Sequence, residues 1–193
     1  MILSVKLNNV KKMNPNKLEN PARLAELNPT DTLKKIGFGK HDVLCDIGAG
    51  TGIFTIPAAR ITDNTVLALD INDEFLNIIA EKAQKEKLTN IRTLKVTDNY
   101  HDIDSQTVDF VLLVTVLHEI TDKKALLNEI RKIIKETGKL AIIEFHAKQT
   151  PMGPPVEHRL SKDAVHLVCF SHGFSKSKEF DMGDNYYCMV FNA

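Results

Sequence analysis

The sequence predicts an α/β fold in one domain, with a mostly parallel seven-stranded sheet, helices on both of its faces and an antiparallel hairpin at its end. Two observations lead to this prediction. Five short apolar runs suited to buried strands alternate with amphipathic helical stretches, a pattern typical of a parallel sheet with crossover helices. Two further strand-like runs, 174–182 and 185–191, flank a Gly183-Asp184 turn, which indicates antiparallel pairing.

Length and charge limit the classes of function. The chain has 193 residues, enough for one domain that buries most of its apolar surface. Lysine plus arginine and aspartate plus glutamate number 25 each, so no net field draws the protein to nucleic acid, and no such partner is expected. No apolar run approaches the roughly 20 residues that cross a bilayer. Because the first residues also lack a secretion signal, a cytoplasmic location is expected.

The three cysteines indicate a structural role. Cys45, Cys169 and Cys188 are odd in number, widely spaced and flanked by apolar residues. This pattern favours reduced thiols in the core over disulfides or a zinc site. No metal site is predicted.

The stretch Val43–Gly52 predicts a buried strand, a tight turn and the start of a helix. Within it Gly48, Gly50 and Gly52 stand at alternate positions. Because glycine lacks a Cβ atom, such a turn can adopt positive φ and bring main-chain N–H groups against a ligand. Ile53 stands where a dinucleotide-binding G-x-G-x-x-G/A turn has its third small residue, and the Gly-Lys-Ser/Thr ending of a phosphate loop is missing. An adenosine derivative with a charged tail is therefore favoured as the ligand.

The run Asp46–Gly52 resembles the first motif of class I S-adenosylmethionine-dependent methyltransferases, in which an acidic residue heads a G-x-G-x-G turn under the methionine part of the cofactor. The resemblance extends from about Thr30 to the C-terminus. It implies S-adenosylmethionine as cofactor and a Rossmann-like, three-layer α/β/α fold, with residues 1–28 as an N-terminal arm or lid and 29–193 as the methyltransferase domain. For 21–27, a linker helix is an equal alternative to a lid. The turn residues implied to bind the cofactor are Asp46, Gly48, Ala49, Gly50, Thr51 and Gly52.

Asp70 ends the next strand-like run, eighteen residues after Gly52. At this distance a carboxylate can accept hydrogen bonds from a ribose diol held over the first strand. Ile71 would then form an apolar wall against adenine. Capping the following helix is the alternative role for Asp70, although Asn72 is already suited to that cap.

Two candidates for adenine contacts follow the third expected strand. In relatives, an acidic residue near this point reaches the exocyclic amine of adenine. Asp98 matches that residue, and the backbone N–H of Asn99 would face a ring nitrogen. Ordinary turn formation is the alternative role for both residues.

The segment Thr115–Ile120 follows the expected strand Val108–Val114. Ligands gather at the carboxyl ends of the strands in doubly wound sheets, so this segment should line the pocket, with Thr115 at the cofactor. It resembles the corresponding segment of the quinone-biosynthesis-like branch of the methyltransferases, where a histidine often occupies the place of His118. His118 could act as a base or hydrogen-bond the acceptor. It could equally cap the short helix and contact the cofactor, and both roles stay open.

Two more catalytic candidates, Glu144 and His146, lie at the end of the strand expected over Lys139–Phe145. The helix before that strand is expected to run through Ile134 and to stop at Gly138. Both candidates therefore fall at the edge of the sheet where ligands gather.

The sequence thus predicts methyl transfer from S-adenosylmethionine to a small-molecule acceptor by in-line displacement. A sulfonium is already an excellent leaving group, so alignment and exclusion of water are the main requirements. Amino-methyltransferases that act on nucleic acid usually carry an Asn/Asp-Pro-Pro-aromatic tetrad where this chain reads Thr-Val-Leu-His. A nicotinamide-dependent oxidoreductase and a non-catalytic S-adenosylmethionine-binding module are the alternatives. The oligomeric state is open, and the sequence is compatible with a homodimer.

Overall fold

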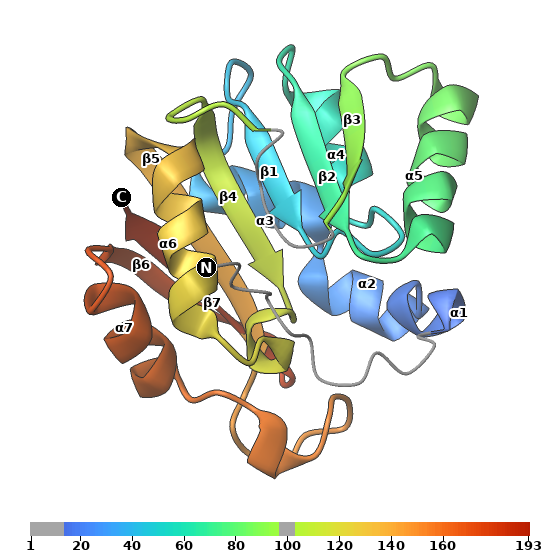
Figure 1. Cartoon of the computed structure of the whole chain (residues 1–193). Helices are drawn as coiled ribbons and strands as arrows, with labels where there is room; N and C mark the ends of the chain where they lie inside the picture. Colours follow the sequence, from blue (N-terminus) through green and yellow to red (C-terminus); the bar gives the residue numbers. More distant parts are fainter. Residues whose placement is uncertain (1–13, 97–102) are drawn as a thin grey trace.

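A computed structural model describes residues 14–96 and 103–193, which form one seven-stranded sheet (Figure 1). The strands are β1 Leu44–Ile47, β2 Val66–Asp70, β3 Ile91–Lys95, β4 Val108–Val114, β5 Ile134–Phe145, β6 Ser175–Met182 and β7 Tyr186–Asn192. They are arranged in the order β3-β2-β1-β4-β5-β7-β6, and β7 runs antiparallel to both of its neighbours. The other pairs are parallel. The predicted fold class, including the terminal hairpin, is confirmed.

Helices cover both faces of this sheet. They are α1 Pro15–Leu18, α2 Pro21–Leu27, α3 Pro29–Ile36, α4 Thr55–Ile61, α5 Asp73–Glu86, α6 Lys123–Ile133 and α7 Lys162–Phe170, with short 3-10 turns η1 Leu117–Glu119 and η2 Val156–His158. Helices α6 and α7 cover one face, and α3 and α4 cover the other, whereas α1 and α2 lie beyond the carboxyl ends of the strands (Figure 1). Within the described ranges, no helix is long and apolar enough to cross a membrane.

The core consists of two main apolar clusters, one on each face of the sheet. Helix α6 shows how the sequence builds them, because its buried side chains follow the helical repeat and form one stripe. These side chains are Leu126, Leu127, Ile130 and Ile133. Cys45 and Cys169 belong to this cluster, and Cys188 belongs to the one on the opposite face. All three cysteines are free and buried, which confirms the expectation of core thiols.

The start of β5 differs from the sequence prediction. Helix α6 ends at Ile133, and the strand begins at Ile134 rather than at Lys139. The reason is that Ile134 pairs with Val108 on β4, and the register then shifts before Lys139 pairs with Phe110. A bulge therefore occupies the residues expected to end the helix.

Candidate functional site

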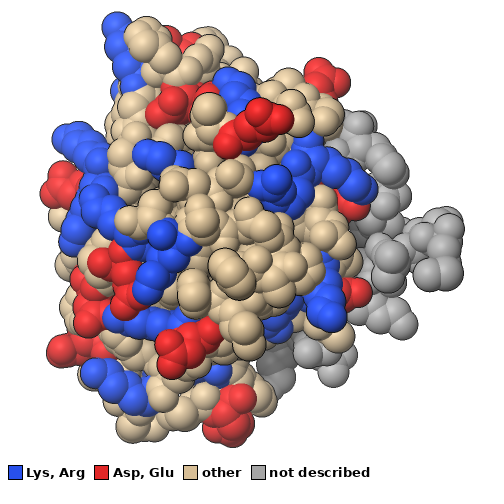
Figure 2. All heavy atoms as spheres, turned by 90° about the vertical axis from the view of Figure 1, so that its left-hand side faces the viewer, with Lys and Arg blue, Asp and Glu red and all other residues tan. Residues whose placement is uncertain are grey.

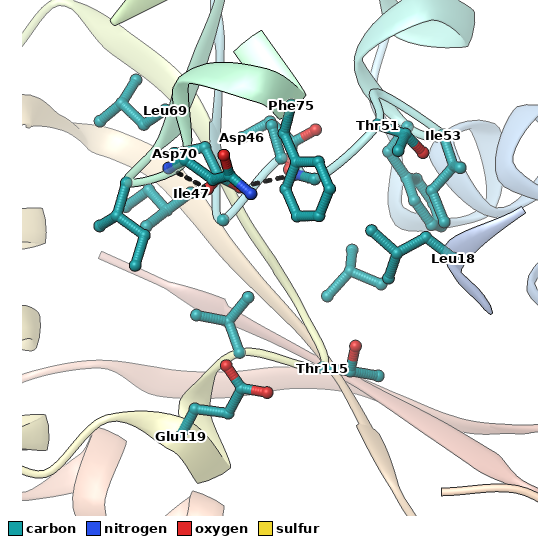
Figure 3. Close-up of a pocket in the computed structure, with 18 of the residues that line it drawn as sticks. Leu18, Asp46, Ile47, Thr51, Ile53, Leu69, Asp70, Phe75, Thr115 and Glu119 are labelled. Carbon is teal, nitrogen blue, oxygen red and sulfur yellow. Dashed lines mark hydrogen bonds between the residues drawn. The ribbon is translucent and has the colours of Figure 1, made fainter. Parts of the chain in front are cut away.

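A pocket opens at the carboxyl ends of β1, β2 and β4 (Figure 3). It contains about 1110 Å³ of empty space, open solvent at its mouth included. Small-molecule sites are usually lined mostly by apolar groups with a few polar ones, and this lining fits that description. Eight of the residues expected at a cofactor line it: Asp46, Gly48, Ala49, Gly50, Thr51, Asp70, Ile71 and Thr115.

The glycine turn forms the floor of the pocket. Gly48 has φ of 72° and Gly50 has φ of 54°, conformations that side chains rarely adopt. A Cβ atom on Gly48 would lie 2.5 Å from Val116 Cγ2, and one on Gly50 would lie 2.9 Å from Leu18 Cδ1. The turn therefore requires glycine at both positions for backbone conformation and for space.

Gly52 has a different role from the other two glycines. It is outside the pocket lining, and a Cβ atom there would lie 2.9 Å from Ile79 Cγ1 on α5. Its absence of a side chain thus lets the turn pack closely on that helix. Helix α4 begins at Thr55, two residues later than the start expected at Ile53, because residues 51–54 complete the turn.

Asp70 joins the glycine turn to β2. Its Oδ2 accepts a hydrogen bond from Gly50 N at 2.9 Å, and its Oδ1 accepts one from Asn72 N at 2.9 Å. Burial raises the pKa of Asp70, against the effect of these backbone donors. Helix α5 is capped by Asn72, whose side chain accepts from Glu74 N. Asp70 is therefore free of the capping role and faces the pocket.

Asp46 lies beneath the turn and is 2% exposed. The Thr55 hydroxyl donates a hydrogen bond to Asp46 Oδ2 at 2.7 Å. Burial, with a further contribution from the charge of Asp70, raises the pKa of Asp46 to about 7. Near neutral pH, a cationic ligand bound nearby would thus favour the ionised form of Asp46.

Helix α2 contributes Arg23 to the pocket wall, a residue that the sequence patterns did not indicate. Arg23 Nη2 donates to Thr115 Oγ1 at 3.2 Å, and Nη1 donates to the Tyr186 hydroxyl at 3.5 Å. Arg23 is 8% exposed, and among the described residues its buried Nε has no hydrogen-bond partner. A guanidinium with a spare buried donor is suited to an anionic group of a ligand.

The segment from Leu18 to Glu26, which carries Arg23, is held by contacts near both of its ends. Glu26 accepts hydrogen bonds from the backbone and side-chain nitrogens of Asn185 at 2.7 and 2.6 Å. Lys82 forms an ion pair with Glu19 and also donates to the Thr51 carbonyl at 2.7 Å. Leu18 and Arg23 of this segment line the pocket, and its role as a lid or as a linker helix stays a prediction.

His118 is bound to a buried carboxylate from the neighbouring strand. Its Nδ1 lies 2.7 Å from Glu144 Oε2, and its backbone N–H donates to Glu144 Oε1 at 3.1 Å. The Glu144 residue is fully buried on β5. On its other side, His118 Nε2 lies 3.8 Å from Glu119 Oε1. The imidazole thus stands between two carboxylates.

The charges in this cluster affect one another. Burial of the His118 ring opposes protonation, but Glu144 and Glu119 outweigh burial and the repulsion of Lys123, so the pKa of His118 is raised. Burial also raises the pKa of Glu119, where His118 opposes the shift and Glu144 and Asp70 reinforce it. His118 therefore keeps its proton to a higher pH than a free imidazole does.

The structure brings together two of the three residues that the sequence suggested for catalysis, His118 and Glu144, and places His146 apart from them. Among the described residues, His118, Glu144 and His146 are all outside the pocket lining, whereas Glu119 belongs to it. His146 packs its ring on Tyr187, with its Nε2 3.7 Å from Asp181, and takes no part in the His118 cluster. Two residues expected at adenine, Asp98 and Asn99, lie outside the described residues.

Residues 45–142, about half of the chain, match the family model described as methyltransferase domain. The chain belongs to the methyltransferase domain family. It is 27% identical over 124 residues to a ubiquinone/menaquinone biosynthesis C-methyltransferase of Teredinibacter turnerae, covering 63% of this chain and 50% of that protein. It is 29% identical over 122 residues to a demethylmenaquinone methyltransferase of Lactobacillus johnsonii, covering 62% and 50%.

A solved structure resembles this methyltransferase-family chain over nearly its full length. The crystal structure of a SAM-dependent methyltransferase from Aquifex aeolicus superposes with a TM-score of 0.85 at 26% identity, covering 93% of this chain and 98% of that one. By contrast, the chain spans about half the length of the curated relatives it matches. The glycine turn and Asp70 fall within the residues that match the family model.

Proposed function

We propose that this methyltransferase-family chain binds S-adenosylmethionine in the pocket and transfers its methyl group to a small-molecule acceptor. The observation that supports this most strongly is the glycine turn tied to Asp70 through Gly50 N, under an apolar pocket. The likeness to the SAM-dependent methyltransferase of Aquifex aeolicus over 93% of the chain agrees with it.

The residues present fit this cofactor. Asp70 retains acceptor capacity for a ribose diol, and Ile71 offers an apolar wall to adenine. The bare turn at Gly48 and Gly50 leaves room for the methionine part, next to the raised-pKa carboxyl of Asp46. The spare Nε–H of Arg23 would pair with the carboxylate of that methionine. Adenine contacts by Asp98 and Asn99, and contact by Gly52, stay predictions.

When bound, S-adenosylmethionine supplies a methyl group on a sulfonium, which leaves as a neutral thioether. The chain's part is to align the acceptor with that methyl group and to exclude water. Leu18 and Arg23 close one side of the pocket, and Val116 and Ile120 give it an apolar wall beyond the strand ends. This enclosure suits an acceptor with an apolar body.

A small molecule is the proposed acceptor for two reasons. The pocket is concave and mostly apolar, as small-molecule sites are, and the chain's net charge of zero offers no field for nucleic acid. The curated relatives named above are methyltransferases of quinone biosynthesis. The cytoplasmic location and the homodimer stay predictions from the sequence.

Titration calorimetry tests the cofactor. We expect S-adenosylmethionine and S-adenosylhomocysteine to bind and a nicotinamide dinucleotide not to compete. Asp70→Asn should weaken both nucleosides by about 10- to 100-fold, since hydrogen bonds to a charged group contribute about 1.5–3 kcal/mol. The matched control is Asp63→Asn, at an exposed aspartate paired with Lys40. Absence of heat with both nucleosides would refute the proposal, and binding without tritiated-methyl transfer across a metabolite panel would leave a non-catalytic module.

A further inference from the structure

Among the described residues, three carboxylates line the pocket, and two of them are already engaged. Asp46 accepts from the Thr55 hydroxyl, and Asp70 accepts from two backbone N–H groups. Glu119 differs from both, because 40% of its side chain is exposed and its carboxylate points into the pocket (Figure 3). It is the carboxylate best placed to meet a second ligand.

The position of Glu119 is fixed by its neighbours in η1. Leu117 is fully buried in the core, and His118 is held to Glu144 through both its ring and its backbone N–H. These two anchors leave the third residue of the turn facing the pocket beyond the end of β4. Glu119 is thus presented by a rigid element, as a residue that meets substrate must be.

We infer that Glu119 is the catalytic residue that receives the proton of the methyl acceptor and that the His118–Glu144 pair positions it. This inference rests on the proposed function. It assigns the acceptor to a chemical class, namely molecules that carry a proton on the atom that becomes methylated, such as a hydroxyl, an amine or a thiol. It also changes the role considered for His118 from base to counter-ion.

The step balances without any further reactant. The acceptor's proton passes to a carboxylate oxygen of Glu119, while the acceptor's electron pair forms the new bond to the methyl carbon. The electron pair of the sulfur–carbon bond returns to the sulfur, which becomes a neutral thioether. The proton on Glu119 then leaves to water at the pocket mouth.

The pKa of Glu119 is raised on balance, and His118 opposes that shift. Burial and the negative charges of Glu144 and Asp70 favour the protonated form of Glu119, whereas the imidazolium, 3.8 Å away, favours the ionised form. The His118 ring is itself 8% exposed and packs edge-on against Phe145. It therefore acts on the acceptor through Glu119.

The test compares matched acceptors and matched variants. Wild-type protein with tritiated-methyl S-adenosylmethionine is offered catechol, a primary aromatic amine and an aromatic thiol, each beside its fully methylated counterpart. We expect transfer to at least one protonated acceptor and to none of the blocked ones. Glu119→Gln should lower kcat about 100-fold or more, the usual contribution of a general base, with S-adenosylhomocysteine affinity changed less than threefold. The control Glu136→Gln alters an exposed glutamate of β5.

A second variant tests the positioning role. His118→Asn removes the imidazolium, so the pKa of Glu119 should rise and the acid limb of the kcat profile should move to higher pH. Rates at high pH should then recover toward wild type, which a merely damaged fold would not produce.

Three results would overturn the inference. They are an unchanged kcat in Glu119→Gln, an unchanged acid limb in His118→Asn, and transfer by wild type to none of the protonated acceptors although calorimetry shows the cofactor binding. If wild-type protein fails to bind the cofactor, the proposed function itself fails.

Discussion

The two halves of the pocket are built in different ways. The donor half, which comprises residues 46–52 and 70–72, depends on a backbone turn, and its main cross-connection, from Gly50 to Asp70, spans 20 residues. The other half, called here the acceptor half, comprises Arg23, Thr115 and Glu119, with the His118–Glu144 pair behind Glu119 and outside the pocket lining. Its contacts span 26 residues between His118 and Glu144 and 92 residues between Arg23 and Thr115. Local sequence determines the first half, and tertiary packing determines the second.

The face shown in Figure 2 has no comparable asymmetry of charge. Figure 2 shows lysines and arginines interspersed with aspartates and glutamates around a mostly uncharged centre on one face. Four substitutions compare how changes in the two halves of the pocket affect stability and ligand binding.

The largest effect is expected for Asp46→Asn in the donor half. Burial raises the pKa of Asp46 in the folded protein from its ordinary value of 3.8 to about 7, so the ionised form is penalised. Because the folded-state pKa of Asp46 is raised, the contribution of Asp46 to the free energy of unfolding is greatest below about pH 4 and falls as pH rises through about 7. Asp46→Asn removes the titrating carboxyl group, so at pH 8 the variant should be more stable than wild type by at most about 4 kcal/mol.

Urea unfolding of both proteins at pH 4 and pH 8 measures this difference. Asp63→Asn, at an exposed position, serves as the control and should show no change of this kind. A constant stability difference between wild type and Asp46→Asn across the range would mean that the carboxylate is not penalised by burial.

Glu144→Gln, in the acceptor half, should act in the opposite direction. Breaking a buried charge pair costs about 3 kcal/mol or more where the partner stays charged, so the loss should be largest at low pH. The raised pKa of His118 makes the wild-type pair most favourable below about pH 6.5 and weaker as pH rises through the folded-state pKa. In the variant, burial dominates, and the pKa of His118 should fall below its usual value.

Nuclear magnetic resonance titration of the His118 ring, together with urea unfolding, follows both effects of this substitution. Glu136→Gln on the exposed start of β5 is the control. Identical His118 titration in wild type and Glu144→Gln would contradict the pairing.

The same contrast explains what the sequence could predict. Alternating strand and helix patterns predicted the sheet and its hairpin, the glycine spacing predicted the turn, and a carboxylate at the end of the second strand predicted Asp70. Each of these signals is contained in a short stretch of sequence. The contact from Arg23 to Thr115 and the pocket-facing position of Glu119 left no such local signal. The bulge after Ile134 was also missed, since pairing with Val108 overrides a helical pattern in the sequence.

Gly48→Ala should produce a smaller loss of folding free energy. This loss measures the effect of crowding at the glycine turn. The substitution places a Cβ atom 2.5 Å from Val116 Cγ2 in a residue with φ of 72°. Strain and crowding together should cost roughly 2 kcal/mol of folding free energy. Gly173→Ala is a matched control, since Gly173 has φ of 83° and nothing within 4 Å of its added Cβ. Equal losses in thermal unfolding would show that Val116 moves aside and that the turn is less constrained than the structure indicates.

Arg23→Lys should have the smallest effect. It tests whether the acceptor half also contributes to binding of the methyl donor. Lysine keeps the positive charge but lacks the planar fork that contacts Thr115 and Tyr186 and that would, in our proposal, also bind a ligand carboxylate. We expect about tenfold weaker binding of S-adenosylhomocysteine, equivalent to about 1.4 kcal/mol, and unchanged binding of 5′-methylthioadenosine, which has no carboxylate. Arg92→Lys on β3 is the control. Equal weakening of both nucleosides would assign Arg23 to packing of α2 and would confine donor recognition to the glycine turn and β2.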